Sequence, residues 1–285
     1  MAVLSYRGLR RSVALLACLA SAAGALTGSP APPTMTAKPF RAVQMNLCNS
    51  GLAGCYTGWS VNRAAAVIRR EEPDLVTLNE VCQGDVERLG RTLRRVLRSD
   101  SVVQAFKAAP DRPTASATRC RDGQQYGIGL LAHVPEPHRG VTTHSGIYPI
   151  QDIRDPEVRA WLCVHAPGHV HACTTHLAYM TPAIALAQCR YLLDTAVPAI
   201  RSRYGYEPMV LGGDLNLSYG GSPDVRSCLP AGYRRHDDGA LQHVMTTGDV
   251  RLDGRRSIAM DGTTDHPSLL VALTIRAVSG GRRKA

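Results

Sequence analysis

The sequence is poor in aromatic side chains and lacks the short motifs of several common enzyme classes. Phe and Trp occur only twice each in 285 residues, which leaves little for an aromatic hairpin that inserts into a membrane. The absence of a Gly-x-Ser-x-Gly elbow argues against a serine hydrolase of that type. The absence of any Cys-x-x-Cys pair argues against a zinc site built on that spacing.

The sequence also lacks an apolar run of about 20 residues, the length that a membrane-spanning helix needs. The shorter apolar run of residues 13–26 follows three arginines and ends in Ala-Gly-Ala-Leu, with the small residues of a cleavage site. This order is typical of a secretory signal peptide. We therefore predict a signal peptide over residues 1–25, a flexible leader over residues 26–38, and a secreted protein.

Cysteines are frequent enough to build a disulfide framework. Without residues 1–25, eight of the nine cysteines remain, and an even number in an exported chain favours disulfides. Two pairs flank a glycine-rich loop or a turn, and two further pairs follow by elimination. The expected bridges are Cys48–Cys55, Cys163–Cys173, Cys82–Cys120 and Cys189–Cys228.

The chain is basic. Its formal net charge of +10 falls to +7 without residues 1–25, because that segment holds three arginines and no acidic residue. A basic surface suits a polyanionic partner, either nucleic acid or an anionic membrane lipid, and it also serves solubility. Nothing in the sequence indicates a stable protein partner, so we expect a monomer.

Apolar, β-branched runs alternate with helical patterns, without an internal linker or a short repeat. The helical patterns cover residues 62–70, 85–98 and 182–204, the last with Pro198 as a candidate kink. The predicted strands cover residues 40–45, 74–78, 128–132, 159–165, 171–175, 209–211, 241–246 and 269–275. These patterns predict one α/β domain over residues 39–277, followed by a basic disordered tail over residues 278–285.

Polar side chains lie beside the ends of several predicted strands. They are Asn46, Glu80, His176, Asp214 with Asn216, and Asp265 with His266, which stand just before the last strand. Sites in α/β proteins form where strands end. Each residue also has an ordinary structural explanation, such as an Asx turn or a buried histidine. Because the whole set would need five such coincidences, we predict one shared site.

This set of side chains suits the hydrolysis of a phosphate ester. Mg²⁺ prefers hard oxygen ligands and few protein carboxylates, and Glu80 can supply one. An attacking water needs an acceptor and an orienting amide, which Asp214 and Asn216 offer. His176 and His266, as imidazolium donors, would stabilise the charge that develops on the phosphoryl oxygens.

Two glycines, Gly212 and Gly213, stand directly before Asp214. Glycine has no Cβ, so a ligand can approach its backbone closely. We therefore expect these glycines to make room for a phosphate. A different signal, His169-Val-His171, has a spacing that could bind Zn²⁺, but we expect the tip of a hairpin there.

The motifs together resemble those of the endonuclease/exonuclease/phosphatase superfamily, the fold of deoxyribonuclease I. The resemblance covers nearly all of the predicted mature chain and depends on an ordered set of motifs, none of them decisive alone. They are Gln44-Met-Asn46, Leu78-Asn-Glu-Val81, Tyr126-Gly-Ile-Gly-Leu-Leu131, Thr175-His-Leu177, Gly213-Asp-Leu-Asn216 and Thr264-Asp-His-Pro267. The resemblance implies a four-layer α/β sandwich of the α+β type, with two packed mixed β-sheets flanked by helices.

The resemblance also implies a divalent-metal site at one shared edge of the two sheets. By similarity, Glu80 binds Mg²⁺ with help from Asn46, and Mn²⁺ or Ca²⁺ are alternatives. Asp265 assists the metal or holds the site in shape.

Further roles follow by similarity for the remaining side chains. Asp214 and Asn216 position the nucleophile and the phosphate. His176 contacts the phosphate or acts as an acid, and His266 contacts the scissile phosphate as a donor or base. Tyr126 supports the site.

One position departs from the pattern of the superfamily. The penultimate strand usually carries an Asp that hydrogen-bonds the last catalytic His, whereas Gln242 stands there in this chain. A Gln carbonyl can orient His266 but lacks the charge that stabilises an imidazolium. The departure predicts slower catalysis or a shifted pH dependence, unless Asp237 or Asp238 substitutes.

Three functions fit the sequence. The leading hypothesis is an exported, Mg²⁺-dependent phosphodiesterase on nucleic acid, with an endonuclease on DNA as its first form. The second keeps the chemistry but changes the substrate to a phospholipid headgroup, such as sphingomyelin or a phosphoinositide. The third is a catalytically weak binding module or toxin-like subunit, which Gln242 favours and the complete set of acids and histidines disfavours.

Overall fold

The computed structural model describes residues 35–135 and 140–278. The predicted signal peptide and residues 279–285 of the predicted basic tail lie outside the described residues. The first strand, β1, covers Met35–Asn46, so the end of the predicted leader belongs to this strand.

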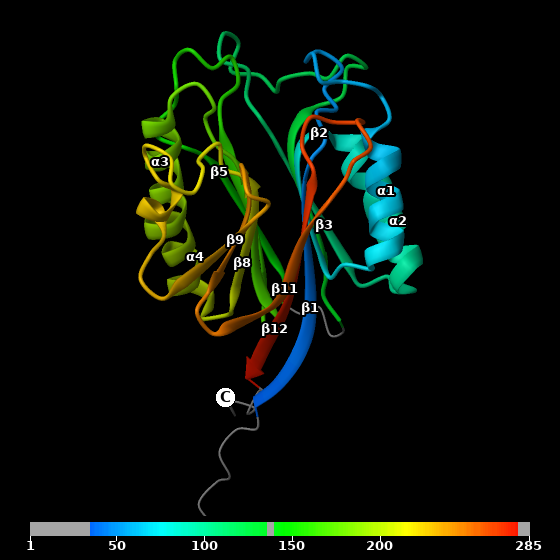
Figure 1. Ribbon diagram of the computed structural model, residues 1–285, viewed down its shortest axis with the longest axis vertical. Coiled ribbons are helices and arrows are strands. Elements are labelled where there is room, and N and C mark those ends of the chain that lie inside the picture. The colour runs from blue at the N-terminus through cyan, green and yellow to red at the C-terminus, as the bar shows by residue number, and fades with distance from the viewer. Residues whose placement is uncertain (1–34, 136–139, 279–285) are drawn as a thin grey trace, which may run out of the picture. The chain divides into compact units, whose positions relative to one another are not determined.

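The described residues form two six-stranded sheets that face each other (Figure 1). The first has the order β11 (Val250–Ile258), β12 (Ser268–Val278), β1, β2 (Leu75–Cys82), β4 (Tyr126–His133) and β3 (Val102–Ala108). The second has the order β5 (Thr142–Ile147), β6 (Ala160–Ala166), β7 (Val170–His176), β8 (Met209–Asp214), β10 (Gln242–Thr247) and β9 (Tyr233–Asp237). Both sheets are mixed, because β1 pairs with β2, and β7 with β8, in parallel.

Helices cover the outer face of each sheet (Figure 1). The first sheet is covered by α1 (Ser60–Glu71) and α2 (Gln83–Leu97), and the second by α3 (Pro182–Tyr191) and α4 (Val197–Tyr204). The order helix, sheet, sheet, helix confirms the predicted four-layer sandwich. None of the helices that the structure describes combines the length and the apolar composition needed to cross a bilayer.

The helix predicted over residues 182–204 contains a π-helical turn, η1 (Leu192–Ala196), between α3 and α4. Pro198 lacks a backbone N–H, so it cannot bond to the carbonyl of Asp194. One turn of wider hydrogen bonding, with Val197 N–H bound to Leu192 O, precedes the proline. A short 3₁₀ helix, η2 (Val225–Cys228), follows β8.

Apolar side chains fill three layers of core. One layer lies between the sheets and includes Leu130, Leu162 and Val210. The other two lie under the helices, with Ile68 in the first and Leu193 in the second. Both central strand pairs are therefore buried on both faces, which explains their nearly continuous apolar runs in the sequence.

All four predicted disulfides are present. They are Cys48–Cys55, Cys82–Cys120, Cys163–Cys173 and Cys189–Cys228. Two of them lie beside predicted site residues, since Cys48 follows Asn46 and Cys82 follows Glu80 at a spacing of two residues. The loops after β1 and β2 are thereby covalently tied down.

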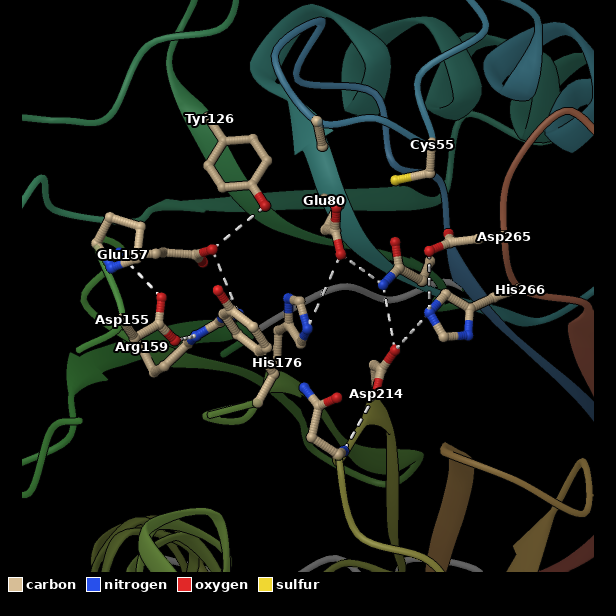
Figure 2. Close-up of a pocket in the computed structure, with 15 residues that line it drawn as sticks. Cys55, Glu80, Tyr126, Asp155, Glu157, Arg159, His176, Asp214, Asp265 and His266 are labelled. Atoms are coloured by element: carbon tan, nitrogen blue, oxygen red, sulfur yellow. Dashed lines mark hydrogen bonds and ion pairs between the residues drawn. The ribbon is translucent and has the colours of Figure 1, made fainter. Parts of the chain in front are cut away.

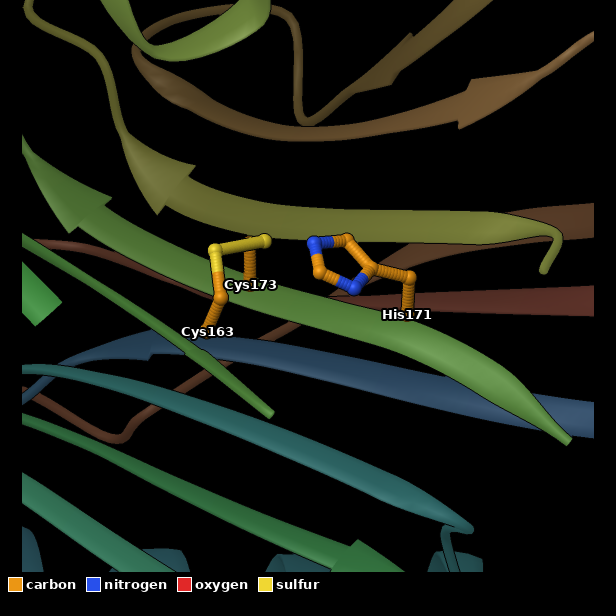
Figure 3. A group of neighbouring side chains, drawn as sticks. All are labelled: Cys163, His171 and Cys173. Carbon is orange, nitrogen blue, oxygen red and sulfur yellow. A yellow bond between two sulfur atoms is a disulfide. The ribbon is translucent and has the colours of Figure 1, made fainter. Parts of the chain in front are cut away.

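The structure does not support a zinc site at His169-Val-His171. Residues 167–169 form the tip of the predicted β6–β7 hairpin, and His171 is buried beside the disulfide Cys163–Cys173 (Figure 3). Burial lowers the pKa of the His171 imidazole to about 3. In the described part of the chain, the groups of three His, Cys and acidic side chains that lie close enough together to hold one ion all include a disulfide-bonded pair. Oxidised sulfurs are not thiolate ligands, so these groups are not metal sites.

Candidate active site

The two parallel strand pairs deliver polar side chains to the same edge of the sandwich. In the first sheet, β1 ends at Asn46 and Glu80 lies near the end of β2. In the second sheet, His176 and Asp214 are register partners at the ends of β7 and β8. Because β1 and β2 pack against β8 and β7, side chains from four strands meet between the sheets.

These side chains line a cleft of about 390 Å³ (Figure 2). The predicted site residues in its wall are Asn46, Glu80, Tyr126, His176, Asp214, Asn216, Asp265 and His266. Of the predicted set, only Gln242 does not line the cleft, because it is buried behind Asp214. The structure thus brings together residues that are spread over most of the domain.

Glu80 reaches the cleft from an irregular part of β2. Its φ of 55° is unusual for a residue with a side chain, and the pairing of β2 with β4 shifts register between Leu78 and Val81. Burial raises the pKa of the Glu80 carboxyl, and the nearby charges of Asp214 and Asp265 raise it further. A bound cation would offset this concentration of negative charge, so the donor set fits a divalent metal.

Asn46 has a different orientation from the one expected of a metal ligand. Its Oδ1 accepts a hydrogen bond from Cys48 N–H at 3.1 Å. Its Nδ2 donates to Glu80 Oε1 at 2.8 Å and to Asp214 Oδ2 at 3.1 Å. Asn46 therefore presents N–H groups to the site and positions the two carboxylates instead of supplying an oxygen ligand.

Several hydrogen-bond donors constrain the carboxylate of Asp214. Its Oδ2 accepts from Gln242 Nε2 at 2.7 Å and lies 3.4 Å from His266 Nε2. Its Oδ1 accepts from the backbone N–H of Asn216 at 3.1 Å. Since the side chain is buried, these donors hold it in one orientation.

Gln242 does not orient His266, contrary to the sequence-based expectation. Its Oε1 accepts from Gln44 Nε2 at 3.0 Å, and its amide nitrogen is used by Asp214. Gln44 also donates to Asn79 Oδ1 at 2.7 Å, and Asn79 Oδ1 accepts from Asp214 N–H at 2.8 Å. This buried chain of amides joins the two sheets behind the site and ends on Asp214.

The carboxylates that face His266 are Asp214 and Asp265, at 3.4 and 3.8 Å from its Nε2. The two candidate substitutes for the missing Asp are engaged elsewhere. Asp237 pairs with Arg235 and Arg255, and Asp238 Oδ1 accepts from the backbone N–H groups of Ala240 and Gln242. Asp214, at the end of β8, thus occupies the position beside His266 that was expected for a residue of the penultimate strand.

His176 is fully enclosed in the wall of the cleft. Burial lowers the pKa of its imidazole well below the usual range, and the charge of Arg159 acts in the same direction. The lowered pKa favours the neutral imidazole of His176, whereas the sequence led us to expect an imidazolium. Its Nδ1 is buried without a hydrogen-bond partner, and its Nε2 lies 4.0 Å from Glu80 Oε1. A neutral imidazole can still donate one N–H to a ligand.

The loop before β12 carries the remaining acid and histidine. Thr264 Oγ1 donates to the backbone carbonyl of Asn46 at 3.1 Å, which ties this loop to the end of β1. Asp265 is half-exposed at the mouth of the cleft. Asp265 and Glu80 line the same cleft.

Gly212 and Gly213 do not open space for a phosphate. A Cβ on Gly212 would lie 2.1 Å from Thr77 Oγ1, and a Cβ on Gly213 would lie 2.4 Å from the carbonyl oxygen of Thr175. Neighbouring protein atoms thus occupy the space that side chains at these two positions would need. These glycines allow the sheets and strands to approach closely.

Gly212→Ala should therefore destabilise the protein. The new methyl group would displace Thr77, whose Oγ1 donates to Gln44 Oε1 at 2.5 Å in the layer between the sheets. Overpacking of this kind costs about 1–3 kcal/mol, so Tm should fall by roughly 2–12 °C. Thermal unfolding followed by circular dichroism measures the change. Gly54→Ala is the control, because nothing lies within 4 Å of its added Cβ. An unchanged Tm for Gly212→Ala would contradict the close packing.

A buried charge cluster in the cleft was missed from the sequence. Arg159 donates from Nε to Asp155 Oδ2 at 2.7 Å, and its Nη1 lies 3.3 Å from Glu157 Oε2 (Figure 2). Tyr126 donates its hydroxyl to the same oxygen of Glu157 at 3.3 Å. The signal in the sequence was the run Asp155-Pro-Glu-Val-Arg159 directly before β6, which places two acids beside one arginine. Arginine is almost never fully buried unless it is paired, and Arg159 is buried.

No family model and no curated protein matches the chain. Solved structures, by contrast, match most of it. The endonuclease/exonuclease/phosphatase from Beutenbergia cavernae DSM 12333 is 19% identical with a TM-score of 0.59, and the match covers 84% of this chain and 72% of that one. The human nocturnin catalytic domain with bound sulfate is 14% identical with a TM-score of 0.59, covering 85% and 98%.

D. rerio TDP2 complexed with a single-strand DNA product is 15% identical, with a TM-score of 0.56, and the match covers 82% of this chain and 98% of that chain. At these identities the comparison establishes a common architecture. The two six-stranded mixed sheets and the flanking helices agree with it. The chain has the fold of the endonuclease/exonuclease/phosphatase superfamily, as its ordered motifs predicted.

Proposed function

We propose that this chain is a divalent-metal-dependent hydrolase of phosphoric esters that cleaves phosphodiester bonds in nucleic acid. The observation that carries the proposal is the convergence of Glu80, His176, Asp214 and His266, from both sheets, in one cleft. The shared fold supports it, because one structure of that fold holds a single-strand DNA product and another a sulfate anion.

Glu80 and Asp265 are the side chains that would hold the cation. When bound, Mg²⁺ would neutralise charge on the phosphate and so favour attack by a nucleophile. The Asp214 carboxylate would accept a proton from the attacking water. Asn46 and Gln242 would keep that carboxylate in place, because both donate to its Oδ2.

The two histidines would act on the phosphate from the protein side. A neutral His176 would donate one N–H to a phosphoryl oxygen. His266 would donate or accept a proton beside Asp214, whose Oδ2 lies 3.4 Å from its Nε2. Such fixed donors stabilise the charge that develops in the transition state.

Secretion and a basic charge are part of the proposal. Four disulfides support an oxidising, extracellular environment. The formal net charge of +7 that remains without residues 1–25 supports a polyanionic substrate.

A second candidate, a phospholipid headgroup phosphoesterase, is favoured by one observation. Several large apolar side chains in loops at the cleft edge of the sheets are strongly exposed, including Leu52, Trp59 and Ile153. Exposed apolar side chains can enter the interface of a bilayer. The chemistry in the cleft would be the same for either substrate.

A panel of phosphodiesters separates the two candidates. Supercoiled plasmid, a single-stranded oligonucleotide, sphingomyelin vesicles and a phosphoinositide would each be incubated with the protein in Mg²⁺ and in EDTA. We expect Mg²⁺-dependent cleavage of the nucleic acids and little release from the lipids. Lipid hydrolysis without nucleic-acid cleavage would replace the first candidate by the second, and inactivity on all four would reject both.

A further inference from the structure

Two exposed tyrosines lie on loops that begin at the same edge of the second sheet as the site residues. Tyr179 follows His176 by three residues on the loop after β7, and Tyr219 follows Asn216 by three residues on the loop after β8. β7 and β8 are parallel neighbours, so both loops start at the mouth of the cleft. The rings are 54% and 60% exposed. Exposed aromatic rings beside a phosphoester cleft point to a planar, apolar part of the ligand.

Tyr179 lines the cleft itself. The guanidinium of Arg159 lies over its ring, with Cζ 5.7 Å from the centroid. Arg159 is only 3% exposed and is paired with Asp155 and Glu157, so its position is fixed. The ring is therefore supported by a rigid cation within the protein while half of its surface remains open to solvent.

Tyr219 does not line the cleft and lies beyond Asn216 along the chain. Its ring contacts two guanidinium groups, with Arg226 Cζ at 4.5 Å and Arg235 Cζ at 5.0 Å from the centroid. The Arg226 side chain is 59% exposed and forms an ion pair with Asp224 at 2.7 Å. Arg235 is 12% exposed and pairs with Asp237, so both guanidinium groups of this Tyr219 cluster are ion-paired. The N–H groups of the exposed Arg226 that Asp224 does not use can still contact an anion of the same ligand.

We propose that Tyr179 is a stacking platform for the nucleobase next to the scissile phosphate, and that the Tyr219 cluster contacts a phosphate farther along a single strand. The proposal rests on the proposed function. Alternating aromatic and cationic contacts match the alternation of base and phosphate along an unpaired strand. A duplex would keep its bases stacked inside and could not use the Tyr179 ring without local melting.

Binding of a labelled 12-nucleotide single strand tests the platform separately from the chemistry. Fluorescence anisotropy in Mg²⁺ would be measured in an Asp214→Asn background, so that the strand stays intact. Tyr179→Ala should weaken binding roughly 5- to 150-fold, the range for loss of one base–aromatic stack. Tyr179→Phe should bind like the parent, because the ring is kept.

Tyr206→Ala is the matched control. Tyr206 is also 60% exposed and packs against an arginine, Arg201, whose Cζ is 4.4 Å from the ring centroid. It precedes β8, however, and so lies at the opposite end of that strand from Asp214. Its replacement should leave the affinity for the strand unchanged.

Abasic strands identify the contact. Removal of the stacking base from the strand should weaken binding to the protein that retains Tyr179. The Tyr179→Ala protein should bind the abasic strand as well as it binds the intact strand. Equal effects of base removal on both proteins, undiminished binding by Tyr179→Ala, or binding to phosphatidylglycerol vesicles in place of the strand would each overturn the proposal. Strand binding with this tyrosine dependence but no cleavage by the wild type would reject the proposed function alone.

Discussion

Asp214→Asn should lower kcat on a single-stranded oligonucleotide by about 10²- to 10⁴-fold, the range for loss of a positioned acid–base group. The substitution preserves the shape of the side chain but removes the charge that would accept a proton from water. It also places an amide where Asn46 and Gln242 both donate to Oδ2, so one acceptor is lost or turned away.

The measurement is steady-state hydrolysis in saturating Mg²⁺, with thermal unfolding recorded for each protein. Asp253→Asn is the control, because this acid pairs with Arg251 on the edge strand β11 and lies outside the cleft. Its activity should equal that of the wild type. Full activity of Asp214→Asn would show that this carboxylate is no part of the reaction.

Glu80→Gln should affect the response to metal. Gln retains an oxygen that can accept from Asn46 Nδ2, so the local geometry should persist. Loss of a residue that only supports a metal ligand weakens metal binding by about 10- to 100-fold. Because Glu80 would be a ligand itself, loss of its negative charge should weaken Mg²⁺ binding by more than that. Activity at low Mg²⁺ should fall correspondingly, and high Mg²⁺ should restore part of it.

A Mg²⁺ titration of phosphodiesterase activity measures this effect directly. Glu207→Gln is the matched control, because Glu207 precedes β8 at the opposite edge of the sheet and its side chain accepts the backbone N–H of Gly168 at 2.8 Å. Its Mg²⁺ dependence should match that of the wild type. An identical titration curve for Glu80→Gln would exclude Glu80 as a ligand.

The buried central strands were predictable, whereas the edge strands were not. The β2 run beginning at Leu75 and the β4 run beginning at Tyr126 are apolar and covered on both faces, so composition alone indicates them. The missed strands β3, β5, β9 and β11 are partly exposed, and β5 alternates between half-buried and exposed positions. β9 and β11 are also rich in arginine, and pairing with a neighbour, rather than local sequence, makes them strands.

The site could be predicted where a residue ends a buried strand, as Asn46 and His176 do. The partners of these residues could not, because they depend on how two sheets register against each other. Gln242 was expected to face His266 and instead donates to Asp214, since β10 pairs with β8 in antiparallel register opposite that acid. The close contact of Gly212 with Thr77 arises in the same way, across the layer between the sheets.

The most direct test of a single cation-dependent phosphodiesterase site is to measure activity after a chelator has removed the metal. The purified protein would be treated with EDTA, freed of chelator, and assayed on the single-stranded oligonucleotide while Mg²⁺ is added back. We expect no measurable cleavage without metal and full recovery with Mg²⁺ for the wild type. Undiminished cleavage by the metal-free protein would contradict it.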